Sequence, residues 1–277
     1  MIDEIPDTCR VVAWRPPVPG ISEVFHAHLV GYRYPSHCHD TWALLIVDDG
    51  AIRYDLDTRR RVAVGDAVTV LPPGVTHNGY PAERGGYFRK RELYLDNDFL
   101  PANLIGPAVD KSTFDDIDLR AAISRVHRRL LRADHLGAEV LLAMVAERAR
   151  HRIAVRTPAV ARPEPPLASR LRDYLDGHLT GKVALADAGL LFDRSVPHLV
   201  RSFKQRYGIT PYAYVTGARV DLARRLLLNG ATPARAAIEA GFHDQAHLTR
   251  HFKRHVSVPP GQYAASATGR RWSLSGN

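Results

Sequence analysis

The sequence predicts a two-domain α+β protein, with a β-barrel or sandwich and flanking helices first and an all-α domain with two helix-turn-helix units last. Short apolar runs between residues 24 and 95 recur at roughly 8–12-residue spacing, with turn sequences between them. A later stretch holds Pro158, Pro163, Pro165 and Pro166, a density that no regular helix survives. Beyond it a helical pattern occurs twice. A length of 277 residues agrees with two domains.

Composition and charge narrow the class of protein. The 45% apolar content is ordinary for a globular chain, and no apolar run approaches the ~20 residues that cross a bilayer, so no membrane partner is expected. The acidic start lacks a signal-peptide core, and Cys9 and Cys38 are too few for a disulfide framework. We therefore expect a cytoplasmic protein.

The net charge of +9 is unevenly distributed. Residues 167–277 hold 16 Lys and Arg but 7 Asp and Glu, which accounts for the whole excess, and residues 1–166 are balanced. This pattern indicates a polyanion partner for the C-terminal part, although a solvated basic surface would look the same.

The N-terminal part reads as a series of strands. Asp48-Asp49-Gly50 is a hairpin signal, and Pro72-Pro73-Gly74 interrupts the chain again. The expected strands are Val24–Tyr34, Thr41–Val47, Ala51–Leu56, Arg61–Val64, Ala67–Leu71 and Gly86–Leu95. So many short strands predict a barrel or sandwich.

Two motifs in this region carry a resemblance. His37-Cys38-His39 and the later Pro72-Pro73-Gly74-Val75-Thr76-His77 are similar to the two halves of the cupin signature of a jelly-roll barrel. In that family such histidines converge on a metal, which implies His37, His39 and His77 as ligands of a divalent ion such as Zn²⁺ or Fe²⁺. The family's carboxylate ligand would fall near Ala43 or Leu44, and neither can ligate.

A small-molecule pocket is the alternative use of these histidines. Such pockets are mostly apolar with a few polar anchors, and aromatic side chains supply much of the lining. Any one of these aromatic residues would equally suit the core. The candidate effector-binding residues are His37, His39, Trp42, Tyr54, His77 and Tyr94.

Two helices are expected next. Asp115-Asp116 can cap a helix from Ile117, and a second helix is expected over about residues 136–151. Both could pack on the barrel, but an apolar stripe on the first favours a contact with a second copy, so we expect a homodimer. The stripe is Leu119, Ile123, Val126 and Leu130.

These signals divide the chain into four parts. We expect a cupin-like effector-binding domain over residues 1–110, a helical pair over 111–153, a proline-rich linker over 154–166 and a DNA-binding domain over 167–277.

The clearest helix-turn-helix unit lies near the C-terminus. Thr232 can cap its first helix, Gly241 permits the left-handed turn and Asp244 can cap the second helix. In that second helix Leu248 and Phe252 share one face, so the opposite face is free to enter a DNA major groove.

A similar unit precedes it. Leu199 and Phe203 repeat the Leu248 and Phe252 spacing, and a long helix starting at Pro211 and ending near Asn229-Gly230 joins the units. About 18 residues at ~1.5 Å each span roughly 27 Å, which can hold two recognition helices in successive grooves about 34 Å apart.

Residues 167–265 resemble the DNA-binding domain of the AraC/XylS family of transcription regulators. The resemblance rests on Ala223-Arg224-Arg225-Leu226-Leu227, Gly241-Phe242-His243-Asp244-Gln245 and Leu248-Thr249-Arg250-His251-Phe252-Lys253-Arg254. It implies an effector-binding domain in front that often dimerises. The first unit departs from the family at Ala188, Gly189, Asp193 and Arg194, and a glycine within a helix costs ~1 kcal/mol, so we expect this unit to be less rigid.

Position within the motif assigns the DNA contacts. The expected base-facing residues are Ser195, Pro197, Val200 and Arg201 in the first unit and Gln245, Ala246, Thr249 and Arg250 in the second. The expected phosphate contacts are Lys204, Lys253 and Arg254. An ion pair within the domain is the alternative role of Arg201 and Arg250. The four-residue spacing of His243, His247, His251 and His255 indicates a solvated helix face rather than a metal site.

The sequence thus predicts a DNA-binding transcription regulator, not an enzyme, that a small-molecule effector controls. Its expected partners are double-stranded DNA, the effector and a second copy, with RNA polymerase as a further candidate. Two alternatives stay open: a regulator whose barrel is only a dimerisation scaffold, and a metal-dependent cupin enzyme fused to a DNA-binding domain.

Overall fold

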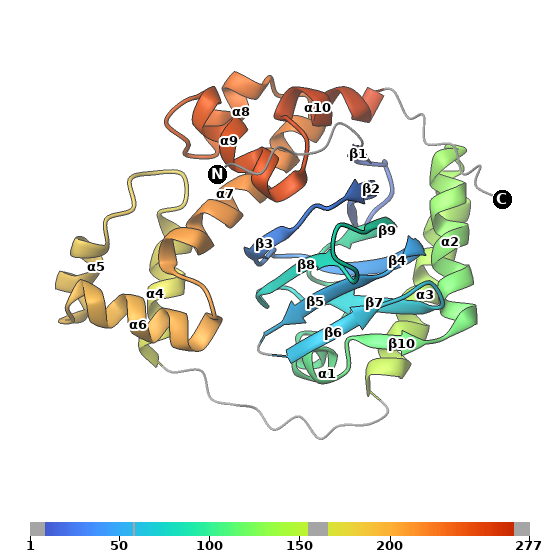
Figure 1. Ribbon diagram of the computed structural model, residues 1–277, viewed down its shortest axis with the longest axis horizontal. Coiled ribbons are helices and arrows are strands. Elements are labelled where there is room, and N and C mark those ends of the chain that lie inside the picture. Colours follow the sequence, from blue (N-terminus) through green and yellow to red (C-terminus); the bar gives the residue numbers. More distant parts are fainter. Residues whose placement is uncertain (1–8, 58, 155–165, 269–277) are drawn as a thin grey trace.

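The computed structural model describes residues 9–57, 59–154 and 166–268 and has two domains (Figure 1). The first is β-rich and the second is helical, so the predicted fold class is confirmed. The expected linker lies outside the described residues apart from its two ends. Within the described ranges, no helix is both long enough and apolar enough to cross a membrane.

The strands form two antiparallel sheets whose inner faces pack together. The six-stranded sheet has, in spatial order, β1 (Arg10–Trp14), β2 (Ile21–Val30), β9 (Tyr87–Leu95), β4 (Trp42–Gly50), β7 (Ala67–Leu71) and β10 (Thr113–Asp115). The four-stranded sheet has β3 (Tyr34–His37), β8 (His77–Pro81), β5 (Ile52–Leu56) and β6 (Arg59–Ala63). The strands expected from the sequence do not include β1, β3, β8 and β10. All four are short or carry polar residues, and three of them lie at a sheet edge.

Helices cover the outer face of the six-stranded sheet. α2 (Ile117–Leu131) and α3 (His135–Ala154) pack there, and the short η1 (Ala102–Leu104) and α1 (Ile105–Asp110) precede them. The stripe of α2 is fully buried in this core; its members are Leu119, Ile123, Val126 and Leu130. The predicted dimer contact on this helix is therefore wrong, because its own sheet already covers the stripe.

The C-terminal domain consists of two lobes joined by the long helix α7 (Pro211–Leu228). Lobe 1 comprises α4 (Pro166–Gly177), α5 (Leu185–Phe192) and α6 (Val196–Tyr207). Lobe 2 comprises α8 (Pro233–Glu239), α9 (Gln245–Val256) and α10 (Pro260–Thr268). The predicted caps are confirmed, since Thr210, Thr232 and Asp244 each accept a hydrogen bond from a backbone N–H of the following turn.

Lobe 2 sits directly on the barrel (Figure 1). Its apolar core, including Leu248 and Phe252, is continuous with that of the barrel. The Tyr32 hydroxyl donates to the carbonyl oxygen of Arg254 at 2.6 Å. Lobe 1 has a separate core, which includes Cys38 from the segment after β3. The β3 segment therefore touches the barrel interior on one side and the DNA-binding domain on the other.

Candidate functional site

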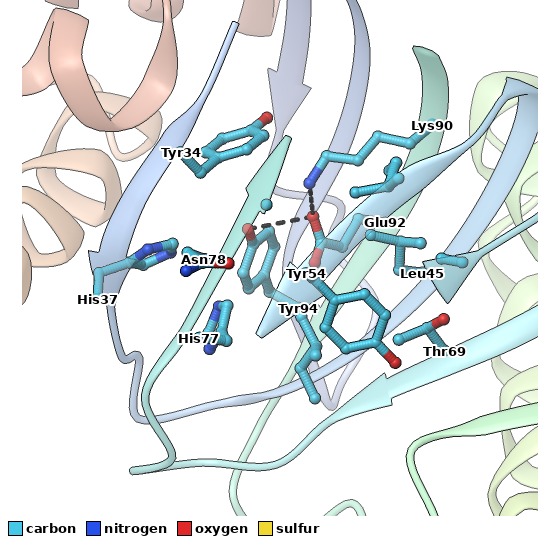
Figure 2. Close-up of a pocket in the computed structure, with 14 residues that line it drawn as sticks. Tyr34, His37, Leu45, Tyr54, Thr69, His77, Asn78, Lys90, Glu92 and Tyr94 are labelled. Carbon is cyan, nitrogen blue, oxygen red and sulfur yellow. Dashed lines mark hydrogen bonds and ion pairs between the residues drawn. The ribbon is translucent and has the colours of Figure 1, made fainter. Parts of the chain in front are cut away.

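A small cavity lies between the two sheets (Figure 2). Its volume is about 40 Å³. The lining residues are Tyr34, His37, Leu45, Ile52, Tyr54, Ala63, Thr69, Leu71, His77, Asn78, Gly79, Lys90, Glu92 and Tyr94.

The cavity contains one buried ion pair. Lys90 Nζ lies 2.7 Å from Glu92 Oε2, and both side chains are almost fully buried. The Tyr94 hydroxyl donates to the same oxygen at 3.3 Å, and the ammonium lies 4.6 Å from the ring centre of Tyr34. Opposite charges cancel here, and hydroxyl and amide groups surround them, so the lining suits a polar ligand without net charge.

Three histidine rings gather at one end of the cavity. The ring of His77 lies 4.5 Å from that of His37 and 4.7 Å from that of His39, centre to centre. Each Nδ1 lies 2.8 to 3.0 Å from a backbone carbonyl oxygen. The pairs are His37 with Pro35, His39 with Thr41 and His77 with Val75. A carbonyl only accepts, so each Nδ1 carries the proton. Burial lowers the pKa of all three rings, which are therefore neutral.

The metal site expected at these histidines is not supported. In the part of the chain that the structure describes, no group of three His, Cys, Asp or Glu side chains is arranged to hold a metal ion. Ala43 and Leu44, near the place of the family's carboxylate ligand, are both buried apolar residues. Three neutral imidazoles whose Nδ1 atoms donate to carbonyls are donors that zinc accepts, so the assignment of His37, His39 and His77 to a metal stays a prediction.

Five of the six predicted effector residues lie in or beside the cavity. His37, Tyr54, His77 and Tyr94 line it, and His39 contacts the rings of His77 and Tyr94. Trp42 does not reach it, because it packs with Leu44 and Ile46 in the core between sheet and helices. Side chains alternate along β4, so Ala43 and Leu45 face inward and Trp42 faces outward.

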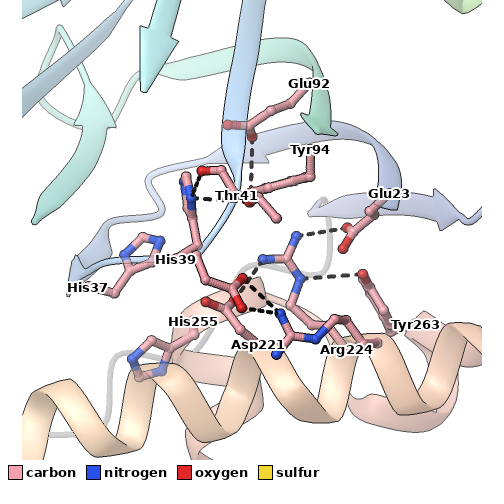
Figure 3. Close-up of polar contacts among 12 residues, drawn as sticks. Glu23, His37, His39, Thr41, Glu92, Tyr94, Asp221, Arg224, His255 and Tyr263 are labelled. Atoms are coloured by element: carbon pink, nitrogen blue, oxygen red, sulfur yellow. Dashed lines mark hydrogen bonds and ion pairs between the residues drawn. The ribbon is translucent and has the colours of Figure 1, made fainter. Parts of the chain in front are cut away.

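The cavity lies close to the contact between the domains (Figure 3). Arg224 of α7 is buried there, and its Nη2 lies 2.7 Å from Oε1 of Glu23 on β2. Its Nη1 lies 3.1 Å from Oδ1 of Asp221, and its guanidinium lies 4.4 Å from the ring centre of Tyr94. Burial opposes the charge of Arg224, but Glu23 and the other acidic groups offset this and raise its pKa. Arg224 thus ties α7 to a cavity residue and to β2.

His37 joins the cavity to α7 in a second way. Its side chain lines the cavity, yet a Cβ on Gly217 of α7 would lie 3.4 Å from the Cβ of His37. Its ring also lies 6.1 Å from that of His255 on α9. A displacement of His37 would therefore change its contacts with both the connecting helix α7 and the second recognition helix α9.

The predicted DNA contacts lie largely on the surface. The exposed ones are Ser195, Pro197, Arg201, Lys204, Gln245, Ala246, Arg250, Lys253 and Arg254, and the half-buried ones are Val200 and Thr249. Leu199 and Phe203 of α6, and Leu248 and Phe252 of α9, are fully buried. Within the described ranges neither Arg201 nor Arg250 forms an ion pair. This favours contact with DNA over the alternative role in an ion pair within the domain.

The histidines of α9 differ from the expected solvated face. The His251 side chain packs near Phe242, with ring centres 6.0 Å apart, and burial lowers its pKa to about 4. Burial also lowers the pKa of His255, which faces the barrel. His243 alone agrees well with the expectation, since its side chain is 88% exposed.

The residues predicted from the sequence do not include the buried ion pair of the cavity or the ion pair between the domains. Lys90 and Glu92 lie on the inward face of β9 with Phe88 and Tyr94, and the two-residue period of that strand could have placed them. Glu23 and Arg224 are 201 positions apart, and no sequence spacing links them.

The fold and site define a class of protein, one with a cavity-bearing sensor barrel attached to paired helix-turn-helix units. A helix-turn-helix domain model matches residues 191–266, and a model of the AraC-like ligand binding domain matches residues 19–146. The chain belongs to the AraC family of transcriptional regulators. It is a transcriptional regulator with an N-terminal ligand-binding domain and a C-terminal helix-turn-helix domain.

Known proteins agree along most of the chain. An uncharacterised HTH-type transcriptional regulator of Bacillus subtilis, YbfI, is 27% identical over 255 residues, 80% of this chain and 86% of the relative. A putative AraC-like transcription regulator of Streptomyces lividans is 34% identical over 142 residues, 49% and 45% of the two chains. The structure of fatty acid-bound ToxT from Vibrio cholerae has a TM-score of 0.58 at 11% identity and covers 96% of this chain and 98% of ToxT, a likeness of fold.

Proposed function

We propose that a small polar molecule in the barrel cavity controls how α7 and lobe 2 sit on the barrel, and thereby controls DNA binding. The observation that carries this proposal is the position of His37, which lines the cavity and packs against Gly217 of α7. A ligand that displaces His37 has different affinities for the docked and undocked arrangements, which is the condition for coupling.

The size and polarity of the cavity limit the effector. A cavity of about 40 Å³ is far below the ~300 Å³ of a typical ligand site, so binding has to displace side chains or the interdomain contact. The ToxT structure carries an unsaturated fatty acid. Here the buried Lys90–Glu92 pair and the surrounding hydroxyls favour a polar effector instead.

The proposal also covers the residues that contact DNA, the domain boundaries and the role of the protein as a non-enzymatic regulator. Arg201 and Arg250 would read bases, and Lys204, Lys253 and Arg254 would contact phosphate. The barrel boundary moves from residue 110 to 115, because β10 pairs with β7 in the six-stranded sheet, and the proposed boundaries at 153 and 166 are kept. We propose a cytoplasmic regulator that recruits or blocks RNA polymerase and is not an enzyme, because its relatives are regulators and its cavity groups are engaged with one another.

A homodimer through α3 is also proposed. Leu136, Val140 and Met144 are spaced by four, and all three are more than half exposed, although α3 packs on α2 through its other face. An antiparallel pair of α3 helices crossing near Val140 would bury this stripe, with Leu136 of each copy against Met144 of the other. Val140→Glu should convert the dimer to a monomer in sedimentation, whereas an unchanged mass would exclude this surface.

The experiment for the main proposal combines two measurements on the full chain. A panel of polar metabolites is screened for thermal stabilisation, and each hit is tested for its effect on binding to DNA from the regulator's own promoter region. Thr69→Phe fills the cavity and should abolish both effects while leaving DNA binding without ligand intact. If hits act equally on this variant, or none stabilises the protein, the barrel is only a scaffold.

A further inference from the structure

A second and much larger cavity lies between the two lobes of the DNA-binding domain. This interlobe cleft is open to solvent and has a volume of about 620 Å³, against about 40 Å³ in the barrel. Volumes of roughly 300–1,000 Å³ are typical of sites for small organic ligands. The predicted contacts with DNA bases and the ligand cavity of the barrel both lie elsewhere, so neither gives this cleft a role.

Three elements line the cleft. Its floor is one face of α7, where Tyr212, Val215 and Arg219 follow at helical spacing. One wall is the α4–α5 connection with Lys182, and the other is the end of α8 with Ile238 and the turn after it with Gly241. A molecule in the cleft would touch both lobes at once.

Contacts between the lobes hold the cleft in shape. Arg219 Nε donates to the carbonyl oxygen of Leu179 at 2.7 Å, and its Nη2 donates to that of Gly181 at 2.7 Å. Gly241 has a φ of +80°, and a Cβ there would lie 2.9 Å from the same Leu179 oxygen. The lobes therefore meet at this place without room for a further side chain, and the separation of the walls is set by backbone contacts.

The lining combines apolar surface with positive charge. Tyr212 and Ile238 are 67% and 62% exposed, and exposed apolar side chains that face one hollow mark a ligand groove. Lys182 and Arg219 are its cations, and no residue of the lining is Asp or Glu. The carboxylate of neighbouring Asp244 is occupied as the cap of α9. Within the described ranges the structure gives Lys182 no hydrogen bond or ion pair.

We propose that the interlobe cleft binds a small amphipathic organic anion, with its apolar body against Tyr212 and Ile238 and its carboxylate or sulfonate at Lys182. The bound anion lies between the two cationic lobes and neutralises part of the charge that attracts DNA phosphates, so it lowers DNA affinity. This consequence rests on the proposed DNA-binding function, but the binding itself does not.

The binding test uses the full chain and the fluorescent sulfonate 8-anilinonaphthalene-1-sulfonate (ANS) as the probe. Ile238→Glu places a negative charge in the cleft and should weaken ANS binding at least tenfold. Leu191→Glu is the matched control, because Leu191 is 63% exposed and lies outside the cleft lining. Both sites are on the surface, so circular dichroism should show both variants folded. Equal ANS affinity in the two variants would overturn the proposal.

A second arm tests the role of the charge and separates it from DNA binding. Lys182→Gln should weaken ANS binding severalfold, whereas Arg84→Gln, on an exposed residue of the barrel, should not. In the wild type ANS should weaken promoter binding about threefold or more at low salt, and Ile238→Glu should resist this effect. If Lys182→Gln weakens DNA binding while ANS binding is unchanged, the cleft serves phosphate and the proposal fails. If the wild-type protein shows no DNA binding at all, the proposed function is contradicted. The ANS titrations of the variants would still show whether the cleft binds an organic anion.

Discussion

Arg224 of α7 and Glu23 of β2 form a buried ion pair across the two domains, with Nη2 and Oε1 2.7 Å apart and less than a tenth of either side chain exposed. The same guanidinium lies over Tyr94, which lines the barrel cavity. A charge pair in this position holds the domains in one register, because Glu23 without Arg224 would be a buried carboxylate without its cation, and Arg224 without Glu23 would keep only Asp221. The sensor and the DNA-binding domain are thus joined at the wall of the cavity itself.

Removing one partner of this pair should destabilise the docked arrangement. In Glu23→Gln the Arg224 charge stays buried with Asp221 as its remaining carboxylate, so the cost should lie below the about 3–5 kcal/mol of a fully uncompensated charge. We expect a lower melting temperature and faster proteolysis between the domains. The double variant Glu23→Gln/Arg224→Met should recover only part of the loss, because it leaves the buried Asp221 carboxylate without its cation. Equal melting temperatures of Glu23→Gln and the wild type would show that the pair does not hold the domains together.

Local patterns predicted the helices well, because each has a chemical boundary. Thr210, Thr232 and Asp244 cap the helices that follow them, and Asp193, at φ 52°, takes the left-handed turn after α5. Gly189 has a structural reason as well. A Cβ there would lie 2.8 Å from the carbonyl oxygen of Arg194, so the tight α5–α6 turn requires glycine. Reduced rigidity of the first unit stays a prediction.

Longer-range features could not be predicted in the same way. The stripe of α2 fits a sheet as well as a partner helix, and the sequence does not say which of the two covers it. The histidine motif placed three rings together, as the cupin resemblance implied, whereas their role as metal ligands stays a prediction. The Glu23–Arg224 contact depends on how two domains dock, which no local period records.

The cap of α7 gives a matched pair of stability variants. The Thr210 hydroxyl oxygen accepts a hydrogen bond from the Ala213 N–H at 3.2 Å, whereas Ser195, also an N-cap residue, makes no such side-chain bond. Thr210→Ala should therefore lower the free energy of unfolding by about 1 kcal/mol, and Ser195→Ala should change it by much less. Urea denaturation of both variants measures the difference. A larger loss in Ser195→Ala would contradict the cap assignment.

The buried pair of His26 and His127 should make stability depend on pH. Their rings share a 3.0 Å contact between β2 and α2, and burial, with the nearby charge of Arg91, lowers the pKa of His26 to about 3. The pKa of His127 is also lowered, by burial and by its neighbours His26 and Arg91. Between pH ~6.5 and ~4 the unfolded chain binds protons that the folded chain does not, so stability falls as pH falls.

His127→Leu tests this pair directly. Each such histidine contributes at most about 1.4 kcal/mol per pH unit, so the variant should show a shallower fall in the free energy of unfolding between pH 6.5 and 4.5. His243→Leu is the control, because the side chain of His243 is 88% exposed. If His127→Leu keeps the slope of the wild type, the pair is not a source of the pH dependence.

If α9 reads bases, alanine substitutions at Arg250 and Lys253 should impair DNA binding in different ways. Arg250 and Lys253 are both exposed on α9, but the motif places Arg250 at base edges and Lys253 at the phosphate backbone. Arg250→Ala should cost about 1–3 kcal/mol of specific binding and relax the choice of base at one position. Lys253→Ala should weaken binding to all sequences alike and reduce the salt dependence by about one counterion. Titrations against the promoter and single-base variants of it, at several salt concentrations, separate these two patterns. A loss in Arg250→Ala that is the same for every sequence would remove Arg250 from the base-reading set and leave it as a phosphate contact.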